Sequence, residues 1–204
     1  MHARIATFEG GRPEYLEIGR RLGREQFEPK LKQMQGFAGH LYLADPDSGR
    51  SLGIVLFDSP EALEAGDREL NEMSPPDELE GIRRTSIDRY EVLHHELSGS
   101  PQAARVSRLT GSAGQLDEAR STLETTLPRI RSIDGWLGAV AFADVSTGNT
   151  VLITLWESMD ALRRSEQEAD RLRQEAADAM QHRIAGVERY EVLGALIPTG
   201  AAAR

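Results

Sequence analysis

The sequence contains no cysteine, no long apolar run and no excess of basic residues. Without cysteine there can be no disulfide, no thiolate nucleophile, no zinc-thiolate site and no iron-sulfur cluster. No segment reaches the roughly 18 consecutive apolar residues of a membrane span, and the first residues lack the basic start and apolar stretch of a secretory signal. We therefore expect a cytoplasmic protein without a membrane partner.

The charge balance argues against a nucleic-acid partner. The chain has 24 lysines and arginines against 33 acidic residues, which gives a formal net charge of -9 and a pI near 5.1. Such a chain repels phosphate backbones. A hydrophobic content of 39% is typical of a soluble globular protein, and 204 residues can form one or two domains. Residues 198–204 are interpreted as a disordered tail.

An internal repeat organises the chain. Residues 36–63 align without gaps on residues 135–162, and ten of these 28 positions are identical, against roughly two expected by chance. The block Arg-Tyr-Glu-Val-Leu at 89–93 also returns unchanged at 189–193. Residues 98–102 have the composition of a linker. The sequence therefore predicts one repeat over 1–97 and a second over 103–197.

Each repeat has the pattern strand, helix, strand, strand, helix, strand. Glycine-containing turns join the middle strands into hairpins, and serines precede the second helices as N-caps. Pro29 and Pro128 are expected to kink or stop the first helix of each repeat. The predicted strands are 3–9, 37–45, 50–58 and a strand through 89–93 in the first repeat, and 103–109, 136–144, 149–157 and a strand through 189–193 in the second.

This order is that of a ferredoxin-like α+β fold, with a four-stranded antiparallel sheet and helices on one face. Several of the strands, such as residues 52–57 and 136–142, are apolar on both faces. A sheet with two apolar faces needs a second cover besides its helices. We therefore expect the two repeats to form an intramolecular pseudo-dimer, while further association of chains is left open.

Two motifs resemble the antibiotic-biosynthesis-monooxygenase branch of the dimeric α+β barrel superfamily. The first is Met-Gln-Gly-Phe-Ala-Gly at 34–39, which returns as Ile-Asp-Gly-Trp-Leu-Gly at 133–138. The second is Leu-Phe-Asp-Ser-Pro-Glu-Ala-Leu at 56–63, which returns as Leu-Trp-Glu-Ser-Met-Asp-Ala-Leu at 155–162. The resemblance implies that the tandem chain supplies both halves of a barrel that separate chains usually form. The fold itself hosts many chemistries.

Oxygenases that resemble this sequence use neither metal nor flavin. A base removes a proton from the substrate and the carbanion reacts with oxygen, which requires an apolar pocket, a base and hydrogen-bond donors. The resemblance places Trp156 at the site position, where the first repeat has Phe57. A large aromatic residue on a buried strand is also a common core residue, so both interpretations of Trp156 stay open.

Haem-degrading members of the superfamily carry an asparagine near the first strand and a histidine ligand on the second helix. The matching positions here hold Thr7 and Arg108 in the strands, and Asp67 and Glu166 in the helices. The resemblance therefore implies no haem, and we expect no cofactor and no metal.

A polar pair distinguishes the first repeat. His40 and Tyr42 alternate onto one face of the second strand, with Ala38 and Ala44 as small neighbours. A neutral histidine beside a tyrosine can serve as a base and a donor, or the two can be a buried hydrogen-bonded pair. The candidate catalytic residues are therefore His40, Tyr42 and Trp156.

Two functional hypotheses follow. The first is a cofactor-independent monooxygenase-like enzyme that acts on a small aromatic or polyketide-like molecule. The second is a non-catalytic member of the superfamily that binds a small ligand or serves as a scaffold. A small-molecule ligand is therefore a possible partner, and neither hypothesis involves nucleic acid or a membrane.

Overall fold

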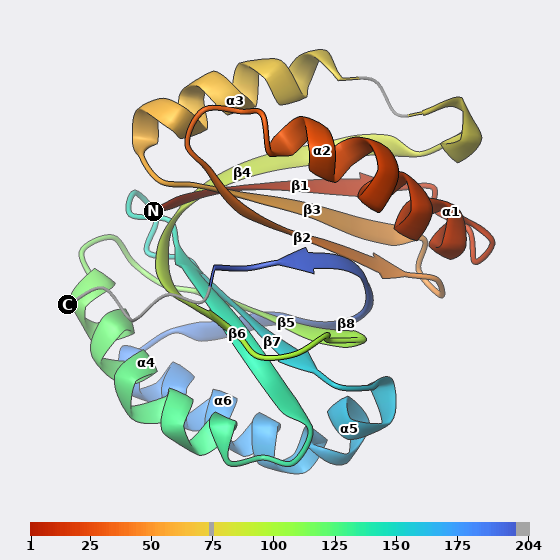
Figure 1. Ribbon diagram of the computed structural model, residues 1–204. Helices are drawn as coiled ribbons and strands as arrows, with labels where there is room; N and C mark the ends of the chain where they lie inside the picture. The colour runs from red at the N-terminus through yellow and green to blue at the C-terminus, as the bar shows by residue number, and fades with distance from the viewer. Residues whose placement is uncertain (74–75, 199–204) are drawn as a thin grey trace. The chain divides into compact units, whose positions relative to one another are not determined.

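The computed structural model describes residues 1–73 and 76–198 (Figure 1). Of the predicted tail at 198–204, only Pro198 lies within the described residues. The chain divides into two compact units, of which the first contains Met1–Tyr90 with Tyr190–Pro198 and the second contains Glu91–Arg189. The last strand of each predicted repeat, β4 or β8, thus begins in one unit and ends in the other.

The first unit alternates strands and helices in the predicted order. Helices α1, α2 and α3 lie on the same face of the sheet formed by β1, β3 and β2 (Figure 1). Its elements are β1 (His2–Glu9), α1 (Tyr15–Leu22), the π-helix η1 (Gly23–Phe27), α2 (Glu28–Leu31), β2 (Phe37–Asp45), β3 (Arg50–Phe57), α3 (Pro60–Glu72), the 3₁₀ turn η2 (Asp77–Leu79) and β4 (Arg83–Leu97).

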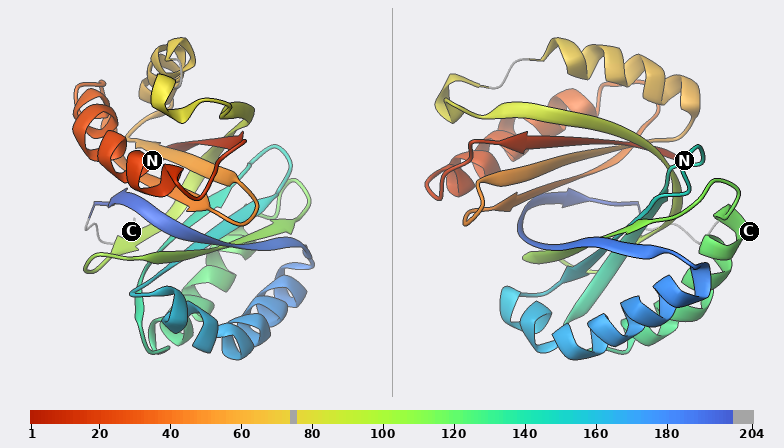
Figure 2. Two further views of the ribbon diagram at one scale, coloured as in Figure 1. Left: turned by 90° about the vertical axis from the view of Figure 1, so that its right-hand side faces the viewer. Right: turned by 180° about the vertical axis from the view of Figure 1, so that it is seen from behind.

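The second unit repeats this order with longer, more regular helices. Helices α4 and α6 pack against each other and lie on one face of the sheet formed by β5, β7 and β6 (Figure 2). Its elements are β5 (Ala103–Thr110), α4 (Leu116–Arg131), β6 (Trp136–Ala143), β7 (Thr150–Trp156), α5 (Met159–Arg164), α6 (Glu166–Met180) and β8 (Arg183–Leu196).

The strand pairs are antiparallel, and the register confirms the equivalence of the repeats. Ala6 of β1 pairs with Gly53 of β3, and at the equivalent place Ser107 of β5 pairs with Leu152 of β7. The hydrogen-bonded order is β4-β1-β3-β2-β8 in the first unit and β8-β5-β7-β6-β4 in the second. Every strand therefore has two neighbours, the pairing scheme of a dimeric α+β barrel, and the predicted α+β fold class is confirmed.

Local sequence signals explain the helix starts. Ser59 Oγ accepts a hydrogen bond from the Ala62 N–H at 3.1 Å, and Ser158 Oγ accepts from the Ala161 N–H at 3.1 Å, so both predicted N-caps are confirmed. Pro128 lies inside α4, which continues past it to Arg131, so the expectation that this proline stops the helix is wrong. The second helical segment of the second repeat is divided at Ser165 into α5 and α6.

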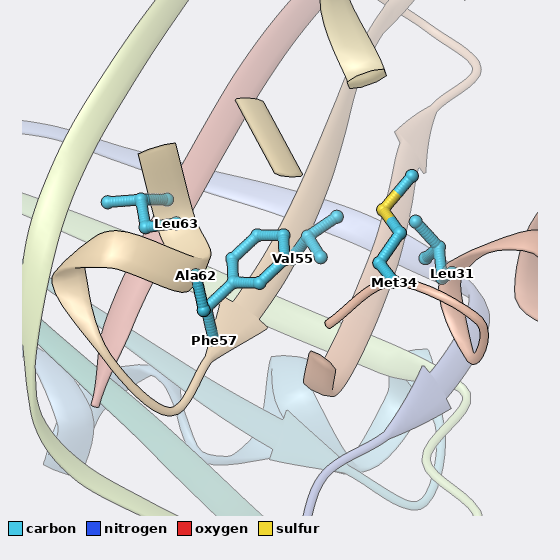
Figure 3. Packing of buried hydrophobic residues seen from close by; sticks show 6 residues of the cluster. All are labelled: Leu31, Met34, Val55, Phe57, Ala62 and Leu63. Carbon is cyan, nitrogen blue, oxygen red and sulfur yellow. The ribbon is translucent and has the colours of Figure 1, made fainter. Parts of the chain in front are cut away.

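The core of the first unit lies between its sheet and the ends of two helices. Figure 3 shows Val55 and Phe57 of β3 between Leu63 of α3 on one side and Leu31 of α2 on the other. These side chains are almost fully buried. Burial of one such side chain stabilises the fold by about 1.5–3 kcal/mol, so this cluster fixes the helices at one end of the sheet. Beyond this cluster, the helices and the sheet line the cavity described in the next subsection.

Candidate functional site

A cavity of about 540 Å³ lies inside the first unit, between the sheet and the helices that cover it. Its floor is built by side chains that alternate onto the helix-facing side of the strands, such as Ala6, Tyr42 and Val55. Its roof comes from α1 and η1, including Leu16 and Phe27. Most of the lining is apolar, and the volume is within the range of small-molecule sites.

The second unit encloses far less space in the equivalent place. The cavity there measures about 80 Å³ and is lined from α4, α6 and the sheet. Leu152 of the second unit lines this small cavity, whereas its counterpart Gly53 lines the large one. A Cβ atom built at Gly53 would meet only Phe8, at 3.5 Å, so the missing side chain leaves room. Sequence differences at matched positions therefore account for part of the difference in volume.

The π-helix η1 is a second local cause of the larger cavity. Pro29 follows Arg20 by nine residues, whereas Pro128 follows Arg120 by eight, so the first repeat has one extra residue in this helix. A single inserted residue widens one turn of an α-helix into a π-turn, and such turns are frequent at functional sites. Gly23 and Phe27, the first and last residues of η1, both line the cavity.

His40 and Tyr42 lie side by side, as the sequence predicts. Their rings are stacked with centroids 4.6 Å apart, and Gly194 of β8, which has no side chain, leaves room for both. His40 is 1% exposed, and its Nε2 lies 3.3 Å from Glu28 Oε2. Its Nδ1 has no hydrogen-bond partner among the described residues. Only Tyr42 of the pair belongs to the described cavity lining.

Burial sets the protonation of both groups. It lowers the pKa of His40, an effect that outweighs the opposing hydrogen bond with Glu28, so the imidazole is neutral near pH 7. Burial also raises the pKa of the Tyr42 phenol, with a further contribution from the Glu28 carboxylate. Tyr42 therefore offers the cavity a neutral hydroxyl. In the described part of the chain this hydroxyl has no hydrogen-bond partner, so it is available to a ligand oxygen.

Trp156 belongs to the second unit and lies at the end of β7. It is fully buried, and its indole N–H donates to Thr154 Oγ1 at 3.0 Å. The guanidinium carbon of Arg105 lies 5.4 Å from the indole centroid, a cation-π distance. The side chain lines the smaller cavity and packs on Ala103 and Leu162. Its polar atom is thus already engaged within the core.

Sequence reasoning missed an ionic triad that occurs in both units. In the first unit, Arg4 Nε donates to Asp67 Oδ1 at 2.6 Å, and Arg89 donates to Asp67 Oδ2. The carboxylate is held by two guanidinium groups, a charge-assisted arrangement. The resemblance matches Asp67 to the haem-ligand position, and here its carboxylate is bound by two arginines.

The second unit has the same triad with a longer acid. Arg105 Nη2 lies 3.1 Å from Glu166 Oε2, and Arg189 Nη2 lies 2.6 Å from Glu166 Oε1. Arg89 and Arg189 are the first residues of the repeated Arg-Tyr-Glu-Val-Leu block. The sequence signal for these triads was an arginine in the first strand of each repeat together with the arginine that opens each Arg-Tyr-Glu-Val-Leu block. Pairing them required knowledge of which strand lies beside which helix.

Comparison with known proteins supports the fold and leaves the chemistry open. No family model matches the chain. Two uncharacterized proteins of Mycobacterium tuberculosis strain H37Rv are similar to it: Rv2557 is 24% identical over 177 residues, which cover 85% of this chain and 79% of the relative, and Rv2558 is 25% identical over 198 residues, which cover 94% and 83%.

Solved structures give a clearer result for the fold. An anthrone oxidase-like protein has a TM-score of 0.63 at 18% identity, covering 100% of this chain and 96% of that one. A ferredoxin-fold protein from Listeria monocytogenes that is related to antibiotic biosynthesis monooxygenases has a TM-score of 0.51 at 9% identity, with 94% and 95% covered. A haem-degrading enzyme, also from Listeria monocytogenes, has a TM-score of 0.54 at 11% identity, with 94% and 99% covered.

These neighbours define the fold of the chain. The chain has the fold of the dimeric α+β barrel proteins that resemble antibiotic biosynthesis monooxygenases, and it carries both halves of the pairing scheme in one polypeptide. At these identities the likeness shows the fold alone. Among the described residues, no group of three or more histidine, aspartate or glutamate side chains could hold a metal ion. No helix in residues 1–73 or 76–198 is long and apolar enough to cross a membrane.

Proposed function

We propose that the protein binds a small aromatic or polyketide-like molecule in the cavity of its first unit. The observation that carries this proposal is the contrast in volume between about 540 Å³ in the first unit and about 80 Å³ in the second. An apolar cavity with few convergent polar groups is the usual form of a small-molecule site. The second unit, which has the same fold and a much smaller cavity, indicates that the fold does not require the large one.

The test is a titration with N-phenyl-1-naphthylamine, an uncharged aromatic dye whose fluorescence rises in apolar surroundings. We expect saturable binding with about one dye per chain, because only one of the two described cavities has room for it. The variant Gly53→Leu introduces the side chain that the second unit carries at Leu152, and it should abolish binding. Its Cβ makes only an ordinary contact with Phe8, so the fold should tolerate the change.

The matched control is Gly186→Leu, which makes the same substitution in β8 of the second unit. A Cβ atom at Gly186 meets nothing within 4 Å, and this residue is not part of either cavity lining. Dye binding should survive in this variant. Absence of saturable binding to the unmodified protein, or unchanged binding to Gly53→Leu, would refute the proposal.

A second candidate is cofactor-independent oxygenation at the same cavity, in which Tyr42 contacts the substrate and His40 stacks on the Tyr42 ring without lining the cavity. It is favoured by the neutral imidazole stacked on a tyrosine whose hydroxyl is available to the cavity. In this chemistry a base takes a proton from an activated carbon, and the carbanion reacts with dioxygen. A neutral Tyr42 hydroxyl would donate to the substrate oxygen on which negative charge develops.

Anthrone is a suitable substrate for this second candidate, since one structural neighbour is named anthrone oxidase-like. Oxygen uptake with anthrone should exceed the uncatalysed rate, and Tyr42→Phe should reduce the excess by about 10²–10³ if the hydroxyl stabilises an oxyanion. A rate equal to the uncatalysed one would reject oxygenation of anthrone and leave ligand binding standing. Trp156 has no part in either proposal, because its N–H is bonded to Thr154 in the second unit.

A further inference from the structure

We infer that the molecule bound in the first unit carries a carboxylate and that Arg84, together with Arg4, recognises it. This inference rests on the proposed function, because it names the chemical class of the ligand in the same cavity. It follows from the distribution of charge around that cavity and from a comparison with the second unit.

Positive charge is concentrated at the cavity although the protein as a whole is acidic. The chain has a formal net charge of -9. Among the described lining residues, however, Asp45 is the one acid, and five are arginines: Arg4, Arg12, Arg50, Arg83 and Arg84. An apolar cavity bordered by guanidinium groups favours a ligand with an apolar body and an anionic group.

The arginines differ in how far the protein neutralises them. Arg83 forms an ion pair with Glu9 at 3.1 Å, so its charge is balanced. Arg84 has no carboxylate partner among the described residues, and its Nη1 only approaches the Leu70 carbonyl oxygen at 3.4 Å. Arg84 therefore retains an uncompensated charge at the cavity, as does Arg12, whose guanidinium carbon lies 5.6 Å from the centroid of the Tyr15 ring.

Arg4 adds a second, buried donor. It is 4% exposed and donates Nε to Asp67 and Nη2 to Asn71, which leaves Nη1 without a partner among the described residues. Burial lowers the pKa of Arg4, and the positive charges of Arg84 and Arg89 contribute to the same direction. Two of these guanidinium groups, Arg4 and Arg89, hold the Asp67 carboxylate, and Arg84 adds a third positive charge that acts on Arg4. A second carboxylate, from the ligand, would relieve this excess of charge.

The second unit supplies the internal comparison. The position that corresponds to Arg84 holds Ile184, five residues before the repeated block in both cases. Ile184 packs against an apolar cluster that includes Leu109, Ala177 and Met180. The second unit, with its small cavity, therefore has an apolar residue at the position where the first unit, with its large cavity, has an arginine. The replacement of Leu152 by Gly53 at the matched position is a second difference at the same cavity.

The test uses two ligands that differ in charge and hardly in shape, 2-naphthoate and 2-naphthamide. Both are measured by isothermal titration calorimetry on the full chain and by displacement of N-phenyl-1-naphthylamine. We expect 2-naphthoate to bind more tightly, and its advantage to shrink as salt is raised, because ions screen the guanidinium charges. In Arg84→Gln the affinity for 2-naphthoate should fall by about tenfold, while that for 2-naphthamide should hardly change.

Two further variants separate a specific contact from overall charge. Arg84→Lys keeps the charge and should retain part of the preference, although lysine lacks the planar fork of arginine. Arg68→Gln removes one charge from an exposed position on α3 that does not line the cavity, and it should leave the preference intact. Equal losses in Arg84→Gln and Arg68→Gln would overturn the assignment of Arg84.

The failure of this inference and that of the proposed function look different. If the uncharged dye and 2-naphthamide bind but 2-naphthoate binds no more tightly, the cavity is a binding site and the carboxylate inference is wrong. If neither the dye nor either naphthalene compound binds, the proposed function fails. The absence of a calorimetric signal with 2-naphthoate then refutes the carboxylate inference as well.

Discussion

Removal of the Asp67 carboxylate should destabilise the protein far more than removal of an exposed carboxylate from the same helix. The Asp67 side chain is 8% exposed and that of Arg4 is 4% exposed, so Asp67→Ala leaves a buried guanidinium without its charge partner. Breaking such a buried pair costs about 3–5 kcal/mol. Arg89, the other partner, has a 56% exposed side chain, and its share of the loss is small because water screens it.

Thermal unfolding followed by circular dichroism measures this cost. At about 2–4 °C per kcal/mol for a chain of this size, Asp67→Ala should lower the unfolding temperature by about 6–20 °C. Glu64→Ala is the control, since Glu64 pairs with Arg68 on the surface of α3 with both side chains largely exposed. That change should cost at most about 1 kcal/mol. Equal losses in the two variants would show that the buried triad does not stabilise the first unit.

The same carboxylate gives the stability a pH dependence of known sign. Burial alone would raise the pKa of Asp67, but the hydrogen bonds from Arg89 and Arg4 outweigh it and the pKa is lowered. The stabilisation is therefore fully present above the unfolded-state pKa of about 3.9 and is lost as the pH falls through the lower folded-state pKa. The difference in unfolding temperature between the unmodified protein and Asp67→Asn should accordingly shrink below about pH 4.

Three further outcomes are expected. Trp156→Phe should cost about 1 kcal/mol for the lost bond to Thr154, whereas Trp156→Ala should cost about 3–5 kcal/mol; thermal melts would reveal a pocket role if neither change mattered. Tyr42→Phe should leave the unfolding temperature nearly unchanged, because the hydroxyl has no partner in the described structure, and should still bind the uncharged dye. Haemin should give no saturable Soret shift, because Asp67 and Glu166 are held by arginines; a stoichiometric complex would contradict this.

Sequence reasoning was sufficient where the signal is local. The hairpin turns, the N-caps at Ser59 and Ser158, and the stacking of His40 on Tyr42 each depend on a few neighbouring residues whose geometry is fixed by strand alternation or by capping. The repeat extended these predictions from one half of the chain to the other. The fold class followed because element order restricts the architectures that can bury the apolar faces.

Sequence reasoning fell short where distant segments decide the outcome. The π-helix depends on one inserted residue, which the alignment shows only as a change of spacing between Arg20 and Pro29. The continuation of α4 through Pro128 depends on packing against α6, which overrides the local preference of proline. The two arginine-carboxylate triads join residues that are far apart along the chain. No periodicity in the sequence identifies such partners.

The pattern of likeness and difference between the two units supports specialisation after duplication. What the units share is structural: the strand register, the serine caps and a carboxylate held by two arginines in each half. Two of the differences between the units lie at the cavity of the first unit, where Gly53 replaces the leucine found at 152 and Arg84 replaces the isoleucine found at 184. Substitutions that affected only stability would be spread through the core and would keep it closely packed, because empty space inside a protein costs stability. A cavity kept open against that cost, and bordered by charge, is the expected result of selection for a ligand.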